Sequence, residues 1–338
     1  MRISGREWIV VASLALAAGG CKTKGAREHD PPPVAPPVPS PAPPAATTVP
    51  TVTAAPFSHA IHPAAGRIVA VGDLHGDLDH TKRALRLAGA IDEAGHWSGG
   101  KLVVVQTGDE IDRGDDDRAV LDAVETWKNE AKAAGGEFIA MLGNHELMNA
   151  KRDFRYVSAN GYAAFSSFAA PRPGNSTTGS GGRTVAFAPG GEYAKILGTR
   201  PAVVKVGSTV FVHGGILPSH AQYGLDRINQ ELDDWLEGRL PLLPDLFTSD
   251  DGPLWTREYS TDQDPNACPT LDSVLASLGA ERMVVGHTVQ RRGITSACGG
   301  HVWRIDVGLS HVFGGPIEVL EIVDDRPRVL REGSSPSE

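Results

Sequence analysis

The sequence predicts an α/β fold in which a single catalytic domain carries its site at the ends of the strands. Apolar runs typical of buried strands alternate with segments of helical periodicity over residues 67–142, which predicts the order β-α-β-α-β. Asp, His and Asn residues stand beside glycine just after these runs, where loops at one edge of a sheet can direct them to one point. A chain of 338 residues, 41% of them hydrophobic, is long enough for one large domain.

The first half of the domain follows the alternation closely. We expect a strand, a helix, a strand, a helix and a strand, in this order, at residues 67–71, 79–90, 102–106, 117–133 and 138–142. The longer helix is amphipathic, because Val120, Val124 and Trp127 fall on one face. Residues 151–191 are rich in Gly, Ser and Arg and weakly periodic. We interpret them as an insertion near the mouth of the site, partly helical around 161–168.

The second half is predicted to contain a hairpin, two helices and four further strands. Residues 202–206 and 209–212 are apolar runs that turn at Gly207 and Ser208, as in a β-hairpin. Helical periodicity covers residues 220–236 and 271–278. The further strands are expected at residues 282–285, 302–307, 317–322 and 328–330.

The N-terminus has the features of an export signal. Two arginines precede an apolar core over residues 9–18, which is too short for a comfortable membrane span. Small residues then lead to Cys21, and this arrangement resembles a bacterial lipobox, in which the cysteine is lipidated. We therefore expect residues 1–21 to be the signal peptide of a periplasmic or cell-envelope lipoprotein tethered to a membrane through Cys21. Plain secretory cleavage and an uncleaved anchor are the alternatives.

A tether without regular structure is expected between the signal and the domain, over residues 22–65. Residues 30–56 consist largely of Pro, Ala, Val and Thr, so that neither a helix nor a sheet can form. The catalytic domain is expected over residues 66–332, followed by a disordered tail at 333–338. The net charge of −9 argues against non-specific nucleic-acid binding, which requires a basic surface.

Two cysteines, Cys268 and Cys298, lie within the predicted domain. In an oxidising compartment such an even pair predicts one disulfide. The alternative is two unpaired thiols that pack in the interior. Neither residue lies in a motif that indicates catalysis.

Five glycine-flanked segments carry the candidate chemistry, at residues 72–77, 108–114, 143–146, 212–215 and 286–288. Divalent cations bind carboxylate and amide oxygens, and the softer ones also accept imidazole. One aspartate can bridge two ions, because each carboxylate oxygen can bind one of them. We predict that one ion binds Asp73, His75 and Asp109, and that the other binds Asp109, Asn144, His213 and His287. This donor set suits Mn, Fe or Zn.

Each segment alone is weak evidence, because a single histidine after a strand is more often a core or capping residue. The prediction rests on the conjunction of the five. Their ordered set resembles the calcineurin-like metallophosphoesterases, and within these the phosphoprotein phosphatases. The phosphoprotein-phosphatase forms are Asp-Arg-Gly at 112–114, Asn-His-Glu at 144–146 and His-Gly-Gly at 213–215.

The closer likeness is to the bacterial Shewanella-like protein phosphatases. It lies in Pro-Gly-Gly at 189–191, in the run at 206–215, and in Gly-Pro-Leu-Trp-Thr-Arg at 252–257. The resemblance covers roughly residues 66–325. It implies a four-layer α/β/β/α sandwich with mixed sheets.

The resemblance also implies a role for individual residues. Arg113 and Arg257 would bind the phosphate oxygens with their guanidinium groups, together with Asn144. For Arg257 the alternative is a surface ion pair with a nearby glutamate. His145 would be the general acid that protonates the leaving oxygen, and Asp112 would orient it. A metal-bridging hydroxide would attack phosphorus directly, so that no Cys or Ser nucleophile is expected.

The sequence therefore predicts a two-metal phosphomonoesterase that acts on phosphoproteins or phosphopeptides, with the phosphate on Ser, Thr or Tyr. A nucleotide hydrolase similar to diadenosine tetraphosphatase is the first alternative, although its usual motif lacks the Asp-Arg-Gly and Gly-Gly forms. A non-catalytic surface binding protein is the second. His145 and Asp112 argue against it, because binding alone requires neither. Glu110 departs from the family, which often has an aromatic or apolar residue there.

Overall fold

The computed structural model describes residues 60–169 and 180–333. The predicted signal peptide, most of the predicted tether and nearly all of the predicted tail lie outside the described residues. Pro56–Glu338 forms one compact unit, and the other unit, Met1–Ala55, lies wholly outside this range. In the described part of the chain, no helix combines the length and the apolar character that a membrane span requires.

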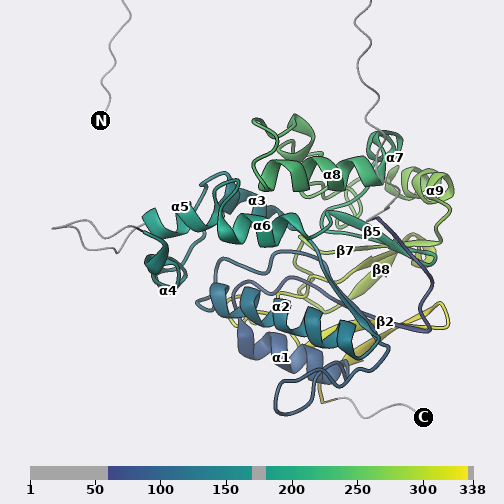
Figure 1. The fold of residues 1–338 in the computed structure, drawn as a ribbon. Coiled ribbons are helices and arrows are strands. Elements are labelled where there is room, and N and C mark those ends of the chain that lie inside the picture. Colours follow the sequence, from purple (N-terminus) through teal and green to yellow (C-terminus); the bar gives the residue numbers. More distant parts are fainter. Residues whose placement is uncertain (1–59, 170–179, 334–338) are drawn as a thin grey trace, which may run out of the picture. The chain divides into compact units, whose positions relative to one another are not determined.

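A five-stranded mixed sheet is built mainly from the first half of the domain (Figure 1). Its strands, in spatial order, are β11 (Arg326–Arg331), β10 (Glu318–Val323), β2 (Arg67–Val71), β3 (Val103–Gln106) and β4 (Glu137–Ala140). The last three are parallel and are connected by α1 (Leu78–Leu87) and α2 (Asp117–Ala133). The predicted β-α-β-α-β order is therefore confirmed.

A second, six-stranded mixed sheet is built mainly from the second half. Its strands, in spatial order, are β1 (Ile61–His62), β5 (Val203–Val206), β6 (Thr209–Val212), β7 (Arg282–Val285), β9 (Val302–Arg304) and β8 (Thr295–Ala297). β5 and β6 form the predicted antiparallel hairpin, and Gly207 occupies a left-handed conformation in its turn, with φ of 59°. β1 lies before residue 66, where the sequence analysis begins the catalytic domain, and pairs with β5.

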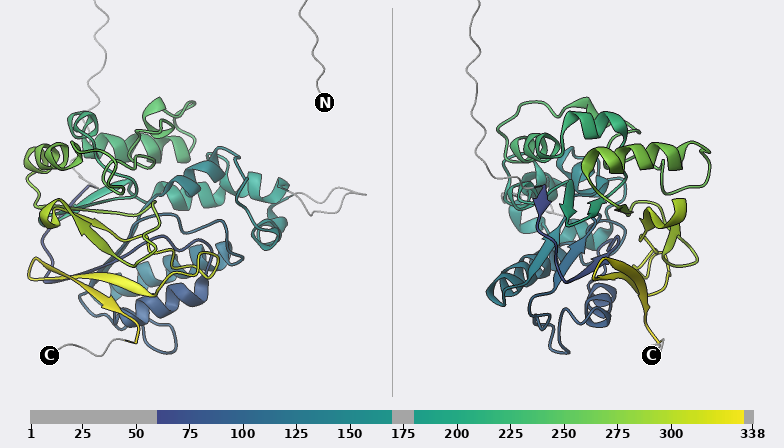
Figure 2. Two further views of the ribbon diagram at one scale, coloured as in Figure 1. Left: turned by 180° about the vertical axis from the view of Figure 1, so that it is seen from behind. Right: turned by 90° about the vertical axis from the view of Figure 1, so that its right-hand side faces the viewer.

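Two apolar clusters define four layers. Along β6, side chains alternate between the clusters: Phe211 belongs to the first, and Val210 and Val212 belong to the second. The first cluster also contains residues of the five-stranded sheet and of α1 and α2, so the two sheets pack face to face and these helices cover the outer face of the five-stranded sheet. The second lies between the six-stranded sheet and a layer of helices. The resulting α/β/β/α order, visible in Figures 1 and 2, agrees with the expected architecture.

The helical layer on the six-stranded sheet differs from the prediction in one place. A single helix was expected over residues 220–236, and this was wrong. The chain forms α7 (Pro218–Tyr223) and α8 (Leu225–Leu236), separated by Gly224 with φ of 100°. Such a backbone conformation interrupts a helix and is accessible mainly to glycine. The layer also contains α6 (Glu192–Gly198), which the sequence analysis missed, and α9 (Ala267–Leu278).

The expected insertion at 151–191 is more helical than its weak periodicity indicates. It contains α4 (Ala159–Ala163), η1 (Ser166–Phe168) and α5 (Gly181–Phe187). Phe165 lies at the centre of its packing, with ring centroids 4.9 Å from both Phe187 and Tyr193. The three rings are buried and belong to the second apolar cluster. The insertion is therefore packed onto the domain.

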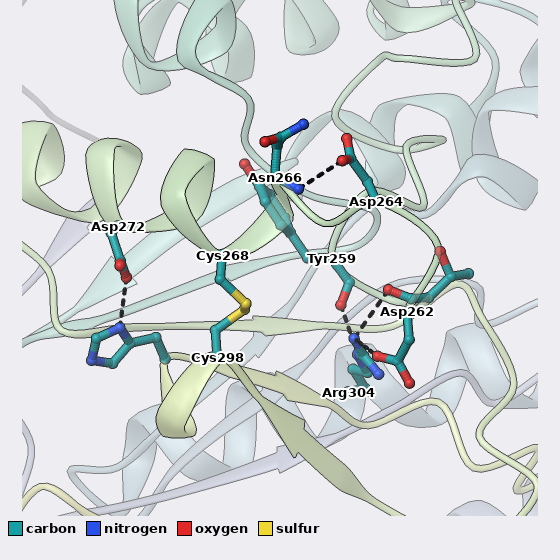
Figure 3. Close-up of a disulfide and its surroundings, with 10 residues drawn as sticks. Tyr259, Asp262, Asp264, Asn266, Cys268, Asp272, Cys298 and Arg304 are labelled. Carbon is teal, nitrogen blue, oxygen red and sulfur yellow. Dashed lines mark hydrogen bonds and ion pairs between the residues drawn. A yellow bond between two sulfur atoms is a disulfide. The ribbon is translucent and has the colours of Figure 1, made fainter.

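Cys268 and Cys298 form a disulfide, as the even pair of cysteines predicted (Figure 3). Cys268 lies at the start of α9, and Cys298 lies in η3 (Cys298–Gly300), which connects the edge strand β8 to its neighbour β9 in the six-stranded sheet. The bond thus joins the helical layer to the edge of this sheet.

Beside the disulfide, Arg304 of β9 holds the loop that carries Arg257. Its Nε donates to the carbonyl oxygen of Tyr259 over 2.6 Å, and its Nη2 lies 2.8 Å from Oδ1 of Asp262 (Figure 3). This loop follows η2 (Asp245–Phe247) and precedes α9. Strand β9 therefore anchors the loop two and five residues after Arg257, a predicted phosphate-binding residue.

Candidate active site

The six predicted metal ligands lie just after strands of both sheets, five of them in loops and Asn144 at the start of a helix, and all six are at least partly buried. Asp73, Asp109 and Asn144 follow β2, β3 and β4 in the five-stranded sheet, while His213 and His287 follow β6 and β7 in the six-stranded sheet. Strands β2, β3 and β4 run parallel to one another in the first sheet, and β6 runs parallel to β7 in the second. Their carboxyl ends therefore meet at one edge, where the loops converge.

The first group of donor atoms surrounds one oxygen of Asp109. Nε2 of His75 lies 3.9 Å from Oδ2 of Asp109 and 4.0 Å from Oδ2 of Asp73. The other ring nitrogen of His75 lies 3.2 Å from the carbonyl oxygen of Ile111, so Nε2 is the nitrogen that faces the carboxylates. Such separations leave room for a cation between the donors.

The second group surrounds the other oxygen of Asp109. Nε2 of His213 lies 3.3 Å from Oδ1 of Asp109 and 2.9 Å from Oδ1 of Asn144. Donor atoms of Asp109, His213 and His287 all lie within 4.8 Å of one another. Asp109 thus presents one oxygen to each group, as expected of an aspartate that bridges two ions.

The glycines beside the ligands make this convergence possible. A Cβ atom on Gly143 would lie 2.1 Å from Oδ1 of Asp109, and one on Gly286 would lie 2.5 Å from Oδ1 of Asp73. Asp109 and His287 themselves have left-handed backbones, with φ of 56° and 67°. Such conformations cost about 1–3 kcal/mol each and occur mainly at functional sites. The glycine-flanked pattern in the sequence therefore has a steric cause.

The electrostatics of the two groups fit divalent cations. Burial, and then the charges of Asp306 and Asp109, raise the pKa of Asp73 well above its ordinary value. Burial lowers the pKa of His75 to about 4 and that of His287 to about 3, so both imidazoles are neutral, the form that binds metals. Buried carboxylates, neutral imidazoles and an amide oxygen form a donor set suited to divalent transition metals.

His213 differs from these two histidines. Burial lowers its pKa, but the carboxylate of Asp109 outweighs this effect and the pKa is raised. Its Nδ1 lies 2.9 Å from the carbonyl oxygen of Thr107, which leaves Nε2 for the site. A metal binds the neutral form of imidazole, so His213 would act as a ligand without a proton on Nε2.

His145 and Asp112 form a buried pair beside the first group. Nδ1 of His145 lies 2.8 Å from Oδ2 of Asp112, and its Nε2 lies 3.8 Å from Oδ2 of Asp109. Burial opposes the charged imidazole, but Asp109 and then Asp112 outweigh it and raise the pKa of His145 to about 9. Nε2 can reach the cleft either as a proton donor or, with His75 and Asp109, as a metal ligand. The two roles make different predictions for a variant.

A cleft of about 470 Å³ opens over these groups and contains both predicted phosphate-binding arginines. The guanidinium carbon of Arg113 lies 3.8 Å from the centre of the Tyr156 ring. Nη1 of Arg257 donates to the carbonyl oxygen of His287 over 3.0 Å and to Oγ1 of Thr288 over 2.7 Å. Among the described residues, Arg257 has no ion pair with a glutamate, the alternative that its sequence context left open.

Asp306 is a residue of the cleft that the sequence analysis missed. It is 1% exposed, lines the cleft and contributes to the raised pKa of Asp73. It follows the apolar run around β9 and stands two residues before Gly308, to whose backbone N–H its Oδ1 is bonded over 2.9 Å. This is the same pattern of an acid after a strand and close to a glycine that identified Asp73 and Asp109. The sequence pattern that identifies Asp306 as a candidate site residue was therefore present.

Glu146 organises the loop that carries Asp109. Its carboxylate accepts hydrogen bonds from the backbone N–H groups of Asp109, Glu110 and Gly143, over 2.9, 2.8 and 2.7 Å. Glu110, the departure noted in the sequence, is fully buried and lies 2.5 Å from Nη1 of the buried Arg200. Glu110 thus makes an ion pair within the interior and does not face the cleft.

Helix α3 (Asn144–Ala150), which the sequence analysis did not predict, adds a second missed residue. Asn149 lies one helical turn after His145, and its Nδ2 donates to both oxygens of Asp112, each over 3.0 Å. A helix assignment at 144–150 would have placed Asn149 beside His145. Arg183, which also contacts Asp112 over 2.9 Å, had no signal in the sequence because it comes from the insertion.

Comparison with known proteins agrees with this geometry. Residues 66–291 match the family of calcineurin-like phosphoesterases. The chain is 37% identical to Shewanella-like protein phosphatase 2 of Arabidopsis thaliana, over 77% of this chain and 75% of that protein. It is 31% identical to Shewanella-like protein phosphatase 1 of Plasmodium berghei, over 79% of this chain and 74% of that protein.

A solved structure extends the comparison to the fold. The cold-active protein-tyrosine phosphatase of a psychrophilic Shewanella species has a TM-score of 0.65 and 25% sequence identity, over 80% of this chain and 82% of that one. Family match, relatives and fold lead to one conclusion: the chain belongs to the calcineurin-like metallophosphoesterases, with Shewanella-like protein phosphatases among its homologues.

Proposed function

We propose that the protein is a two-metal phosphatase that hydrolyses phosphate monoesters on phosphoproteins or phosphopeptides. The observation that carries the proposal is the position of Asp109, which offers one oxygen to each of two donor groups at the base of the cleft. Arg113, Arg257 and His145 line the same cleft. A binding protein would need neither a buried Asp–His pair nor this convergence.

We propose that the donor groups divide between two cations in the way that the sequence predicts. Asp73, His75 and Asp109 would hold one, and Asp109, Asn144, His213 and His287 would hold the other. Divalent cations, when bound, supply positive charge to the phosphate oxygens and activate water for attack on phosphorus. We propose Mn, Fe or Zn, because the donors combine carboxylate, imidazole and amide.

The side chains around the cations would bind the substrate and move a proton. The guanidinium groups of Arg113 and Arg257 would each bind phosphate oxygens, assisted by the amide of Asn144. His145 would donate a proton from Nε2 to the oxygen of the breaking P–O bond, so that a neutral alcohol or phenol leaves. The buried carboxylate of Asp112, at Nδ1, would stabilise the charged imidazole and hold its ring in place.

The relatives support a phosphoprotein substrate, because their names describe protein phosphatases, and one solved neighbour is described as a protein-tyrosine phosphatase. The test is a panel of peptides phosphorylated on Ser, Thr or Tyr, assayed with the purified protein after its metal content has been measured. We expect two metal ions per chain and release of phosphate from at least one class of peptide. Hydrolysis of dinucleoside polyphosphates without hydrolysis of any phosphopeptide would instead favour the nucleotide hydrolase.

We also propose that the protein is exported and tethered through a lipid on Cys21. The disulfide supports export, because such bonds persist mainly in oxidising compartments. Metabolic labelling with a fatty acid in a bacterial host, followed by fractionation, tests the proposal. Label is expected in the wild-type chain and not in Cys21→Ser. An unlabelled chain recovered in the periplasm would support plain secretory cleavage.

A further inference from the structure

We infer that Arg183 is a positioning residue of the reaction, which reaches from the insertion to hold Asp112 and, through it, the ring of His145. The inference rests on the proposed role of His145 as the general acid. Arg183 does not line the cleft, so it contacts no substrate and acts through Asp112. Its effect should therefore appear in proton transfer and leave metal and phosphate binding unchanged.

The carboxylate of Asp112 is fully buried and bound on both oxygens. Oδ2 lies 2.8 Å from Nδ1 of His145, and Oδ1 lies 2.9 Å from Nη2 of Arg183. Asn149 donates to both oxygens. A buried carboxylate is stable only with such partners, and Arg183 is the one that brings a full positive charge from outside the site. Without it, the imidazole of His145 would be the only ion-pairing partner of Asp112 among the residues that the structure describes.

Arg183 is itself fixed by contacts at every guanidinium nitrogen. Nε donates to Oδ1 of Asn149 over 2.6 Å, and Nη1 donates to the carbonyl oxygen of Gly161 over 2.9 Å and lies 2.6 Å from Oδ2 of Asp117. Its charge lies about equally far from two aromatic rings, 5.1 Å from that of Phe165 and 5.0 Å from that of Phe187. A planar guanidinium group held in this way can fix the orientation of the Asp112 carboxylate.

The same contacts join three segments of the chain around Asp112. Arg183 belongs to α5 and Gly161 to α4, both in the insertion, while Asn149 belongs to α3. Asp112 has a left-handed backbone with φ of 71°, and its N–H donates to Oδ1 of Asp117 over 2.8 Å. The packing of the insertion is thus connected to the orientation of His145 through side chains that are all buried.

A general acid matters most when the leaving group is a strong base, because such an oxygen must be protonated as it departs. Loss of the positioning by Arg183 should therefore slow the hydrolysis of phenyl phosphate more than that of 4-nitrophenyl phosphate. The two substrates have similar shapes, and their leaving groups differ in basicity. The ratio of their kcat/KM values, measured on one preparation, does not depend on the fraction of folded enzyme.

The test compares Arg183→Met and Arg183→Lys with Arg200→Met, a matched control. Arg200 is also buried and ion-paired, but with Glu110 and Glu125 and not with Asp112. Arg183→Met should lower the phenyl to nitrophenyl ratio on the order of 10-fold, through kcat and with unchanged metal content. Arg183→Lys should lower the ratio less than Arg183→Met does, because lysine keeps the positive charge but lacks the planar guanidinium group with its several donors. Arg200→Met should lower the melting temperature and leave the ratio unchanged.

An unchanged ratio in Arg183→Met, or an equal fall in Arg200→Met, would overturn the inference. If Arg183→Met does not fold, Arg183→Lys decides by the same ratio, because one ammonium group cannot reach all the partners of the guanidinium. His145→Asn separates the two proposals. If it does not lower the ratio, His145 is not the acid. If it lowers the ratio and the Arg183 variants do not, only the inference about Arg183 fails.

Discussion

Two buried clusters of carboxylates lie side by side in this protein, and they differ in what neutralises them. Around Asp112 and Asp117 the chain supplies its own cation, the guanidinium of Arg183. Around Asp73, Asp109 and Asp306, burial and neighbouring acidic groups raise the pKa of the Asp73 and Asp306 carboxyl groups. The imidazoles of His75 and His287 are neutral, and the histidines that carry a raised pKa, His145 and His213, lie beside Asp109. The first cluster contains a guanidinium group, which is always charged, whereas the second has only histidines within the chain and its donors fit cations from solution.

The substitution with the largest expected effect, Asp109→Asn, disrupts the second cluster. Asp109→Asn removes the carboxylate shared by both donor groups, so metal content and phosphatase activity should fall together. Activity should drop by at least on the order of 10²-fold, because a bound cation contributes several kcal/mol to the transition state. Metal analysis and initial rates measure the two quantities. Full activity with both metals bound would exclude the bridging role.

His145→Asn tests whether the residue that connects the clusters is an acid or a ligand. As an acid it should reduce kcat by roughly 10²–10⁴-fold while both metals remain bound. Metal analysis alongside steady-state kinetics distinguishes the roles. A variant that loses one equivalent of metal would assign Nε2 to coordination.

Asp117→Asn breaks the complete cluster without touching a predicted ligand. It removes one charged partner of a fully buried guanidinium, which destabilises a folded protein by about 3–5 kcal/mol in comparable pairs. We expect a lower free energy of unfolding in urea and a metal content equal to that of the wild type. Loss of metal in this variant would show that the two clusters are not separate.

Metal removal should destabilise the second cluster and leave the first cluster unchanged. Dialysis against a chelator should lower the melting temperature, because the carboxylates of the second cluster then repel each other. If the cation is present at 100 times its Kd, its loss costs about 2.7 kcal/mol. Scanning calorimetry before and after re-addition of Mn²⁺ measures the shift. An apo-protein as stable as the metal-loaded one would contradict the contrast between the clusters.

The smallest effect is expected for Arg257→Ala, at the exposed edge of the cleft. Arg257 is exposed and bonded to the His287 loop, so Arg257→Ala should leave both clusters intact. Loss of one charged hydrogen bond to phosphate should raise KM, lower kcat, or do both, by roughly 10-fold in kcat/KM. Arg155→Ala, which removes another arginine of the cleft that is ion-paired with Asp153, is the control. Equal effects of the two variants would indicate that the positive charge of the cleft matters and would contradict a specific hydrogen bond from Arg257 to phosphate.

What the sequence predicts well follows from local rules. Ligands beside glycine at strand ends could be recognised because the close approach at Gly143 and Gly286 leaves no room for a side chain. The hairpin at Gly207 was readable for a similar local reason. The family resemblance added the roles of His145 and the arginines, which spacing alone does not supply, and these roles stay predictions.

What the sequence does not predict depends on distant packing. Arg183 lies 71 residues from Asp112 along the chain, in a segment of weak periodicity, and only the folded insertion brings them together. The short strands β1 and β8 escape detection because each has two or three residues and lies at the edge of its sheet. Asn149 and Asp306 were readable in principle from helical spacing and from the strand-end pattern.

The crowding around Gly143 has a consequence for how this enzyme can vary. A ligand such as Asn144 can be exchanged for another side chain of similar size while the loop keeps its path. A single extra methyl group at Gly143 would instead overlap Oδ1 of Asp109 and displace the loop itself. In a saturation library we therefore expect Gly143 to tolerate fewer substitutions than Asn144. The space that the glycine leaves free would then constrain the sequence more strictly than the identity of a ligand.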